Sequence, residues 1–394
     1  MSMHKVEIPT EIFYGDGCLA SVGELAKKFG DKVLIIGDEM MGKLGHIDKV
    51  TELLEAEGLT VSHYLGVNSE PNDGHVSEGL AIQEANEANV LVAIGGGSPI
   101  DTAKAIAVVA TNGGYIGDYL QNKTPITQAP LPLIAIPTTA GTGSEVTNVT
   151  VITNTQAQVK MMIKNLAFLP KAAIIDPNMT MTSPQSVTAA TGMDALCHGI
   201  ESYISRISHP LTKTFSMAAI ELILNNIQTA YDHGDNVEAR TNMALGAMEA
   251  GIAFSNASVT LVHGMSRPVG ALFHVPHGIS NSMLLPAVLE FTRDEIVDEL
   301  ADIARLFLST DDAKDQSNDA LADETIAYIK KLSQNLNIPN LKDWGIDAAE
   351  FEGALDKMAT DAIASGSPGY NPRIPSHQEV VELYRTCYDY DFSV

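Results

Sequence analysis

Cysteine and basic residues are scarce in this sequence of 394 residues. The three cysteines, Cys18, Cys197 and Cys387, form a sparse, odd-numbered set that does not suggest a disulfide framework. Lysine and arginine total 24 against 49 aspartates and glutamates, so the formal net charge is −25. Nucleic acids and anionic membrane surfaces attract clustered positive charge, and we therefore expect neither as a partner.

Long apolar runs and targeting signals are also missing. No stretch of about 18 uncharged apolar residues occurs, so the sequence predicts no membrane span. The opening segment, MSMHKVEIPTEIFYGDG, lacks the apolar core of a signal peptide. Together with the few cysteines, these absences favour a cytoplasmic protein in a reducing compartment.

The first part of the chain alternates short apolar runs with helical patterns. The apolar runs predict strands within 32–38, 60–67, 89–97, 131–139 and 172–177. Helical patterns lie between them, within 46–57, 73–88 and 99–112. Strands and helices in alternation indicate βαβ units around a parallel sheet.

After about residue 180 the strand signals stop. Helical patterns cover 187–206, 210–230, 235–255 and 283–308. The length also favours two domains. We therefore predict an α/β fold in which a dinucleotide-binding domain of residues 1–180 is followed by an all-helical domain of residues 181–394, with the active site in the cleft between them.

The segment GGGSPID (95–101) follows an apolar strand and opens a helix. Its glycines let the backbone approach a ligand closely, Ser98 is placed to cap the helix, and free N–H groups at a helix start favour a phosphate. The spacing is not GxGxxG, so the usual dinucleotide fingerprint does not apply. A tight turn without a ligand is the other interpretation, but three glycines and a serine exceed what a turn needs.

Two further features belong to the same predicted edge of the sheet. PTTAGTGSE (137–145) is a second polar, glycine-rich loop after a strand, and its hydroxyl groups can surround a pyrophosphate and ribose. Asp38 ends the first strong strand, where a carboxylate can accept from both ribose hydroxyls of NAD and repel the extra phosphate of NADP. From position alone, a plain surface loop and an ordinary turn aspartate explain the two features equally well.

A candidate metal site lies in the helical part. Asp194 and His198 are spaced i, i+4, so they project from one face of a helix. The segment 262–278 adds His263, His274 and His277, the last held at a break between helices by its Pro and Gly neighbours. Three imidazoles and a carboxylate suit a divalent transition metal. Packed or capping histidines are the alternative, while the absence of HExxH, CxxC and GxSxG disfavours metalloprotease, structural zinc and serine hydrolase chemistry.

At these motifs the sequence resembles the iron-containing, or group III, alcohol dehydrogenases. GGGSPID, PTTAGTGSEVT, GMDALCHGIESY and HGMSRPVGALFHVPHG carry the resemblance, which extends from about residue 5 to residue 385 and is strongest toward lactaldehyde/1,2-propanediol and 1,3-propanediol oxidoreductases. It implies NAD-dependent hydride transfer, a bound Fe(II), zinc or other divalent metal, and assembly into homodimers or larger oligomers.

The resemblance also assigns residues to roles. It implies that the metal ligands are Asp194, His198, His263 and His277. It assigns the dinucleotide site to Asp38, Gly96, Gly97, Ser98, Asp101, Thr138, Thr139, Thr142, Thr147, Val151 and Lys160.

One position departs from the family pattern. Many propanediol-type members carry a histidine four residues after the third ligand, which is thought to relay a proton, and here that position is Arg267. An arginine stays charged at any working pH, so it cannot relay a proton in the ordinary way. The proton then leaves through water, ribose or His274, or Arg267 pairs with a carboxylate, sulfonate or phosphonate group on the substrate. A structural arginine is the third interpretation.

The sequence therefore predicts a metal-dependent oxidoreductase that transfers a hydride between NAD(H) and a small primary alcohol or aldehyde, with Phe254 as a candidate pocket wall. One alternative is a reductase of an anionic aldehyde that uses Arg267, and another is a non-catalytic NAD-binding protein. Zinc-dependent glycerol dehydrogenases and dehydroquinate synthases share the expected architecture, but the Asp–His pair followed by HG…PHG fits the iron group better.

Overall fold

The structure is a computed structural model that describes residues 3–157 and 159–393. The chain folds into two compact units, one of residues Lys5–Ser183 and one of residues 184–393 together with Met3 and His4. The division falls just after the predicted boundary at residue 180. The prediction did not place His4 with the helical unit, where its ring stacks on His209 at 4.6 Å between centroids, because local sequence patterns carry no information about such a distant contact.

A six-stranded parallel sheet forms the centre of the first unit, which confirms the predicted α/β fold. Its strand order is β1-β8-β5-β4-β2-β3. The strands are β1 Glu11–Tyr14, β2 Lys32–Ile36, β3 Thr60–Tyr64, β4 Val90–Gly95, β5 Leu133–Pro137 and β8 Ala172–Ile175.

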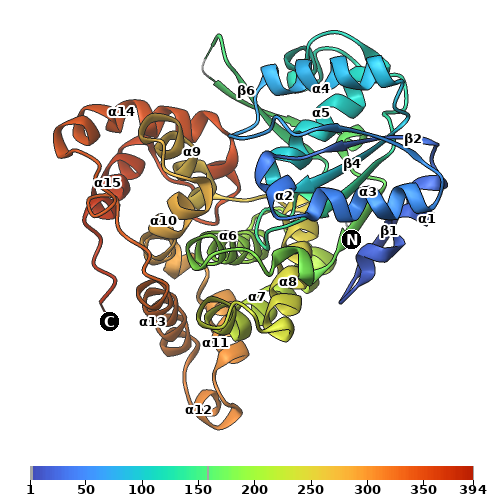
Figure 1. Ribbon diagram of the computed structural model, residues 1–394. Helices are drawn as coiled ribbons and strands as arrows, with labels where there is room; N and C mark the ends of the chain where they lie inside the picture. Colours follow the sequence, from blue (N-terminus) through green and yellow to red (C-terminus); the bar gives the residue numbers. More distant parts are fainter. Residues whose placement is uncertain (1–2, 158, 394) are drawn as a thin grey trace. The chain divides into compact units, whose positions relative to one another are not determined.

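Alternate residues of each central strand face opposite sides of this sheet. In β2, Leu34 and Ile36 pack into one apolar core and Val33 and Ile35 into another. The first core includes residues of α4 (Asp73–Asn86) and α5 (Gly97–Asn112), the second residues of α1 (Val22–Lys27) and α3 (His46–Ala56). The two helix pairs cover opposite faces (Figure 1). Burial on both faces explains why these strands read as continuous apolar runs.

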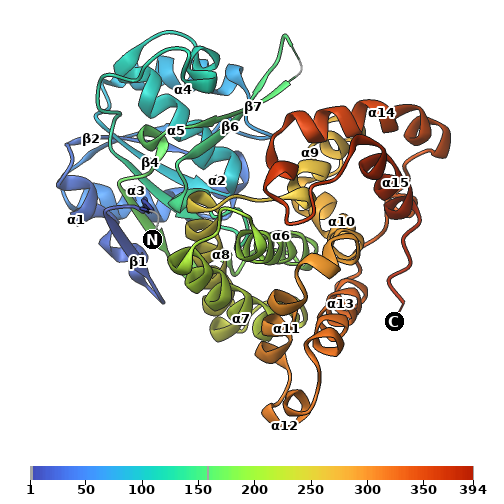
Figure 2. The ribbon, with the colours of Figure 1, turned by 180° about the vertical axis from the view of Figure 1, so that it is seen from behind.

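Several short elements of this unit were not predicted. They include β1, the helices α1 and α2 (Glu39–Lys43) and an antiparallel pair of strands, β6 (Val149–Asn154) and β7 (Val159–Lys164), that run side by side in Figure 2. In β7 the buried Met161 and Ile163 alternate with more exposed residues. Such an alternation with a period of two is typical of a half-buried strand, but β7 is only six residues long.

The second unit consists of helices, and residues 184–393 contain no strand. Its helices are α6 Gln185–Ile204, α7 Pro210–Asp232, α8 Val237–Asn256, α9 Leu261–Phe273, α10 His277–Thr292, α11 Val297–Phe307, α12 Thr310–Lys314, α13 Asn318–Asn335, α14 Ala348–Ala364 and α15 His377–Tyr388. The segment 283–308, predicted as one helix, is two, because a short 3-10 turn at Arg293–Glu295 separates α10 from α11.

Helix α6 is the central element of this unit. From Gly192 to Ile204 every residue is buried, and the helix packs against α7, α8 and α10. A helix buried all round holds its polar side chains in fixed surroundings. Of the helices that the structure describes, none alone is long and apolar enough to cross a membrane; α8 and α9 pass that test only as a pair bent by 101°.

Candidate active site

The carboxyl ends of β2, β4 and β5 lie at one edge of the sheet, since the strands are parallel and in register. From β2 the chain continues to β3 on one side, whereas from β4 it continues to β5 on the other. Asp38 follows β2 and Gly96 follows β4, so the two flank the point where the strand order reverses. In open α/β sheets ligands bind in the crevice at such a switch point.

The glycine loop after β4 leads directly into α5. The helix begins at Gly97 with Gly96 as its N-cap, and no side chain caps it. Ser98 therefore lies inside the first turn, which corrects its predicted capping role. The N–H groups of this turn are not used by a capping side chain, which leaves them available to an anion. Gly95 has a φ of +149°, a conformation that a residue with a Cβ rarely adopts.

The second polar loop packs closely on the first. A Cβ on Gly96 would lie 3.4 Å from Thr139 Oγ1, and one on Gly97 would lie 3.1 Å from the methyl carbon of Thr142. The backbone N–H of Thr138 donates to the carbonyl of Gly95 at 3.0 Å. The structure thus brings together Gly96, Gly97 and the three threonines that were predicted to share a dinucleotide.

A buried lysine that the sequence analysis overlooked joins α5 to this loop. Lys104 is 0% exposed, and its Nζ donates to Ser144 Oγ at 2.9 Å, Thr147 Oγ1 at 2.9 Å and the carbonyl of Val149 at 2.7 Å. Burial lowers the pKa of Lys104 to about 8, although Asp101 nearby opposes the shift. A cationic ammonium with three oxygen acceptors fixes α5 against residues 144–149.

The carboxylate of Asp101 points into the same network. Its Oδ1 accepts from Ser144 Oγ at 2.6 Å and lies 3.6 Å from Lys104 Nζ, and its Oδ2 accepts from the backbone N–H of Val151 at 2.8 Å. Burial raises the pKa of Asp101, and the charge of Lys104 counteracts this. Both oxygens are therefore engaged within the protein.

Two other predicted dinucleotide residues lie farther along the same unit. Asp38 is the N-cap of α2, where its Oδ1 accepts from the backbone N–H of Met41 at 2.9 Å. Lys160 lies on β7 and forms an ion pair with Glu70 at 3.1 Å between Nζ and Oε2. The described contacts do not connect Lys160 to the glycine loops.

In the helical unit, Asp194, His198, His263 and His277 converge. Each offers one ligand atom, and these four atoms all lie within 4.8 Å of one another. From Asp194 Oδ1 the Nε2 atoms of His263, His277 and His198 are 3.5, 3.9 and 4.0 Å away. Asp194 and His198 are one turn apart on α6, whereas the other two histidines come from the starts of α9 and α10. His274, the other candidate, is not part of this group.

The surroundings favour the metal-binding forms of Asp194 and His198. Burial opposes ionisation of Asp194, but the neighbouring histidines hold its pKa below the ordinary value. Burial lowers the pKa of His198 to about 4, so its imidazole is neutral near pH 7. Burial lowers the pKa of His263, but Glu201 and Asp194 raise it to about 9, so a metal would displace a proton from this imidazole. A carboxylate oxygen and three imidazole nitrogens, without a thiolate, are a suitable donor set for Fe(II) or zinc.

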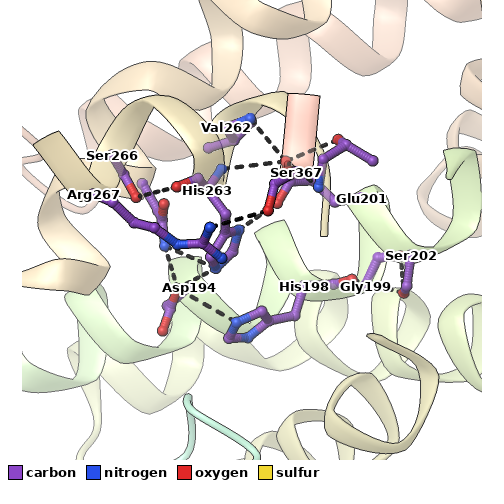
Figure 3. Close-up of polar contacts among 12 residues, drawn as sticks. Asp194, His198, Gly199, Glu201, Ser202, Val262, His263, Ser266, Arg267 and Ser367 are labelled. Atoms are coloured by element: carbon purple, nitrogen blue, oxygen red, sulfur yellow. Dashed lines mark hydrogen bonds and ion pairs between the residues drawn. The ribbon is translucent and has the colours of Figure 1, made fainter. Parts of the chain in front are cut away.

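The side chains of Glu201, Phe254 and Asn281 contact all four candidate ligands, since Asn281 Nδ2 also lies 3.2 Å from His277 Nε2. Glu201 contacts His263 Nδ1 (Figure 3), and Asn281 Nδ2 donates to Asp194 Oδ1 at 2.7 Å. Phe254 stacks on His198 at 4.3 Å between ring centroids, so the residue predicted as a pocket wall lies against a candidate ligand. Sequence reasoning missed Glu201 and Asn281. Glu201 was detectable, since it lies three residues after His198 on the same helix face.

Arg267 lies on α9, one turn after His263 (Figure 3). Its Nη1 donates to Ser367 Oγ at 3.1 Å. Burial lowers the pKa of its guanidinium, and the charge of Glu201 opposes that shift. Arg267 therefore has a hydroxyl partner within the helical unit.

Comparison with known families agrees with this geometry. Residues 9–177 match the model of the iron-containing alcohol dehydrogenases, and residues 188–388 match that of the C-terminal region of the same family. The chain belongs to the iron-containing alcohol dehydrogenase family. It is accordingly an oxidoreductase, an NAD-dependent alcohol dehydrogenase that uses iron.

Individual relatives cover nearly the whole chain. A 1,3-propanediol dehydrogenase from Klebsiella pneumoniae is 37% identical over 391 residues, which is 97% of this chain and 98% of that protein. The lactaldehyde reductase of Escherichia coli (strain K12) is 35% identical over 385 residues, 95% and 97% of the two chains. A crystal structure of a 1,3-propanediol oxidoreductase superposes with a TM-score of 0.93 at 36% identity and covers 98% of this chain and 100% of its own.

Proposed function

We propose that this enzyme interconverts a small, neutral primary alcohol and its aldehyde with NAD(H), in the manner of a propanediol or lactaldehyde oxidoreductase. The observation that carries the proposal is the convergence of one carboxylate oxygen and three imidazole nitrogens within 4.8 Å. The substrates named for the Klebsiella pneumoniae and Escherichia coli relatives support the size and neutrality of the substrate.

Asp194, His198, His263 and His277 would hold the iron. When bound, the iron supplies Lewis acidity toward the substrate oxygen and the NAD supplies the hydride acceptor. Asp194, His198 and His263 are buried, and neighbouring side chains hold the geometry, since Asn281 donates to Asp194 and Phe254 packs on His198. The protein thereby contributes position and charge rather than redox chemistry.

For the dinucleotide, we assign the pyrophosphate to Gly96, Gly97 and Ser98. Their backbone N–H groups open α5, and no side chain caps that helix. Thr138, Thr139 and Thr142 would border the same site, since the structure packs them on the glycines. Asp38 would accept from the ribose hydroxyls of NAD.

Four other residues that the resemblance assigned to the dinucleotide site need a different role: Asp101, Thr147, Val151 and Lys160. The carboxylate of Asp101 is bonded to Ser144 and Val151, and its negative charge would repel a pyrophosphate. We propose that Asp101, Thr147 and Val151 shape the loops that hold the dinucleotide. Lys160, an ion-pair partner of Glu70, would reach the dinucleotide only by leaving that contact.

Arg267 is proposed as a structural residue and not as the anchor of an anionic substrate. Its bond to Ser367 satisfies part of the guanidinium within the helical unit. Because an arginine stays protonated at any working pH, the proton of the alcohol must leave through another group or through water.

A substrate screen with anaerobically purified, iron-loaded protein tests the proposal. We expect alcohol-dependent NADH formation with 1,2- and 1,3-propanediol, its loss on chelation and its recovery with Fe(II). Sulfonate- and carboxylate-bearing aldehydes should be reduced more slowly than lactaldehyde. Metal-loaded protein that forms no NADH with any alcohol would instead support a non-catalytic NAD-binding protein.

We also infer a homo-oligomer, a dimer or larger, in the cytoplasm. The family resemblance supports the assembly, and the three unpaired cysteines support a reducing compartment. Light scattering at several protein concentrations tests the oligomer, and a single monomer mass throughout would contradict it.

A further inference from the structure

Glu201 is a carboxylate buried within the helical unit. It lies near the end of α6, and the residue is 1% exposed. A buried carboxylate is costly unless its oxygens are hydrogen-bonded. Here the hydrogen-bond partners of the side chain are Thr260 and residues in the first turn of α9, the helix that carries His263.

One oxygen of Glu201 caps α9. Oε1 accepts from the backbone N–H groups of Thr260, Val262 and His263 at 3.0, 2.8 and 3.3 Å. It also accepts from Thr260 Oγ1 at 2.9 Å. Thr260 is the N-cap of α9, yet its own side chain makes no capping bond. Glu201 therefore satisfies, from another helix, the donors that an N-cap side chain ordinarily satisfies.

The other oxygen of Glu201 contacts the imidazole ring of His263. Oε2 is the partner of Nδ1 (Figure 3). Since an ionised carboxylate can only accept, Nδ1 must carry a proton. The lone pair left for a metal is then that of Nε2, the atom 3.5 Å from Asp194 Oδ1 in the converging group.

We propose that Glu201 is a positioning residue of the iron site, which fixes both the backbone position and the tautomer of His263. This inference rests on the proposed metal ligands. The capping bonds place the backbone of His263, and the bond to Nδ1 sets the ring orientation and leaves the Nε2 lone pair facing the converging group, where Asn281 Nδ2 lies 3.0 Å from it. Carboxylates that hold a metal-bound histidine in this way typically contribute 10- to 100-fold to metal affinity.

The Glu201→Gln variant separates the two roles of the side chain. Its amide oxygen can still accept from the first turn of α9, whereas its NH2 group would face Nδ1 of His263. An amide N–H cannot accept, so the imidazole would carry its proton on Nε2 and present the wrong tautomer to the metal. Thr260→Val is the matched control, because it removes one bond to Oε1 and leaves the bond to Nδ1 intact.

Zinc affinity is measured by competition with a chromophoric chelator, and iron content after anaerobic reconstitution. We expect Glu201→Gln to lose about 10- to 100-fold in zinc affinity and most of its iron, while Thr260→Val stays within about threefold of the wild type. Equal zinc affinity in Glu201→Gln and the wild type would overturn the inference alone. A wild type that binds neither metal would overturn the proposed ligands themselves.

A measurement on the wild type covers the case in which Glu201→Gln does not fold. In zinc-loaded protein with ¹⁵N-labelled histidine, we expect a downfield proton coupled to Nδ1 of His263, assigned by its loss in His263→Gln. A spectrum in which Nδ1 of His263 carries no proton would overturn the inference.

Discussion

The carboxylate of Asp38 accepts a hydrogen bond from the backbone N–H of Met41 at 2.9 Å and so caps the helix α2. The residue that would discriminate against NADP therefore also stabilises its own loop. A glycine at this position would remove both the charge and the cap, and its effect on cofactor preference would be mixed with a loss of local structure.

Asp38→Asn isolates the charge. An asparagine keeps the capping oxygen, so we expect little loss of stability but a rise of about tenfold or more in the ratio of kcat/KM for NADP to that for NAD. Steady-state kinetics with both cofactors measure the ratio. The neighbouring, exposed Glu39→Gln variant is the control, and an equal change in both variants would exclude a specific role for Asp38.

Loss of one candidate ligand should remove metal and turnover together. We expect His263→Ala to lose its iron and to lower kcat by about 10³-fold or more, since several kcal/mol of transition-state stabilisation depend on the metal. Elemental analysis, kinetics and an NADH titration measure metal, turnover and cofactor binding. His274→Asn is the control, because His274 lies outside the converging group and asparagine tolerates its φ of 55°. Iron-free His263→Ala with normal turnover would refute the assignment.

Arg267→Met tests whether the arginine serves structure or substrate. The loss of its bond to Ser367 should destabilise the protein by about 1–3 kcal/mol. We expect the ratio of kcat/KM for sulfoacetaldehyde to that for lactaldehyde to stay within about threefold of the wild-type ratio. Urea unfolding and steady-state kinetics measure the two effects, and Ser367→Ala is the control for the loss of the same bond. A selective loss of about 100-fold on the anionic aldehyde would assign Arg267 to substrate binding.

Glu145 should make the protein less stable as the pH rises. Burial raises the pKa of this carboxyl from 4.5 to about 7, and the side chain is almost fully buried. Below pH 4.5 both folded and unfolded chains hold the proton, whereas between pH 4.5 and 7 only the folded chain does. The group therefore loses roughly 3 kcal/mol of stabilisation across this window.

Glu145→Gln should remove this pH dependence. We expect the difference in unfolding free energy between variant and wild type to move in favour of the variant from pH 4.5 to 7. Urea unfolding at both pH values, followed by circular dichroism, measures it. Glu55→Gln, an exposed carboxylate on α3, is the control. The same pH dependence in Glu145→Gln and the wild type would contradict the prediction.

The sequence predicted five of the six parallel strands and the helices α3 to α8 because these give strong local signals, whereas the long helices α13 and α14 were covered only by the all-helical assignment of residues 181–394. Residues 33–36 form an unbroken apolar run, and such runs occur where strands are buried on both faces. Short elements escaped, since β1 has only four residues and α2 only five. Ser98 was misplaced because Gly96 occupies the N-cap, whereas serine is the stronger capping residue of the two in sequence statistics.

Asp194 and His198 were detectable since they lie i, i+4 on one helix, whereas spacing left His263, His274 and His277 all as candidates, and the family resemblance selected His263 and His277. Their partners were harder to find. Asn281 is four residues after His277, but only the fold shows that its amide faces Asp194. Lys104 looked like an ordinary helix residue, because its burial depends on a strand that begins some forty residues later.

The burial of Lys104 has a consequence for cofactor binding. Its ammonium bonds to two side-chain hydroxyls and one backbone carbonyl. These bonds link α5 to residues 144–149 without any help from a bound dinucleotide. When a binding site is already ordered, little of the binding free energy is lost to ordering it. Dinucleotide association should therefore be fast and leave these backbone segments as rigid as they were.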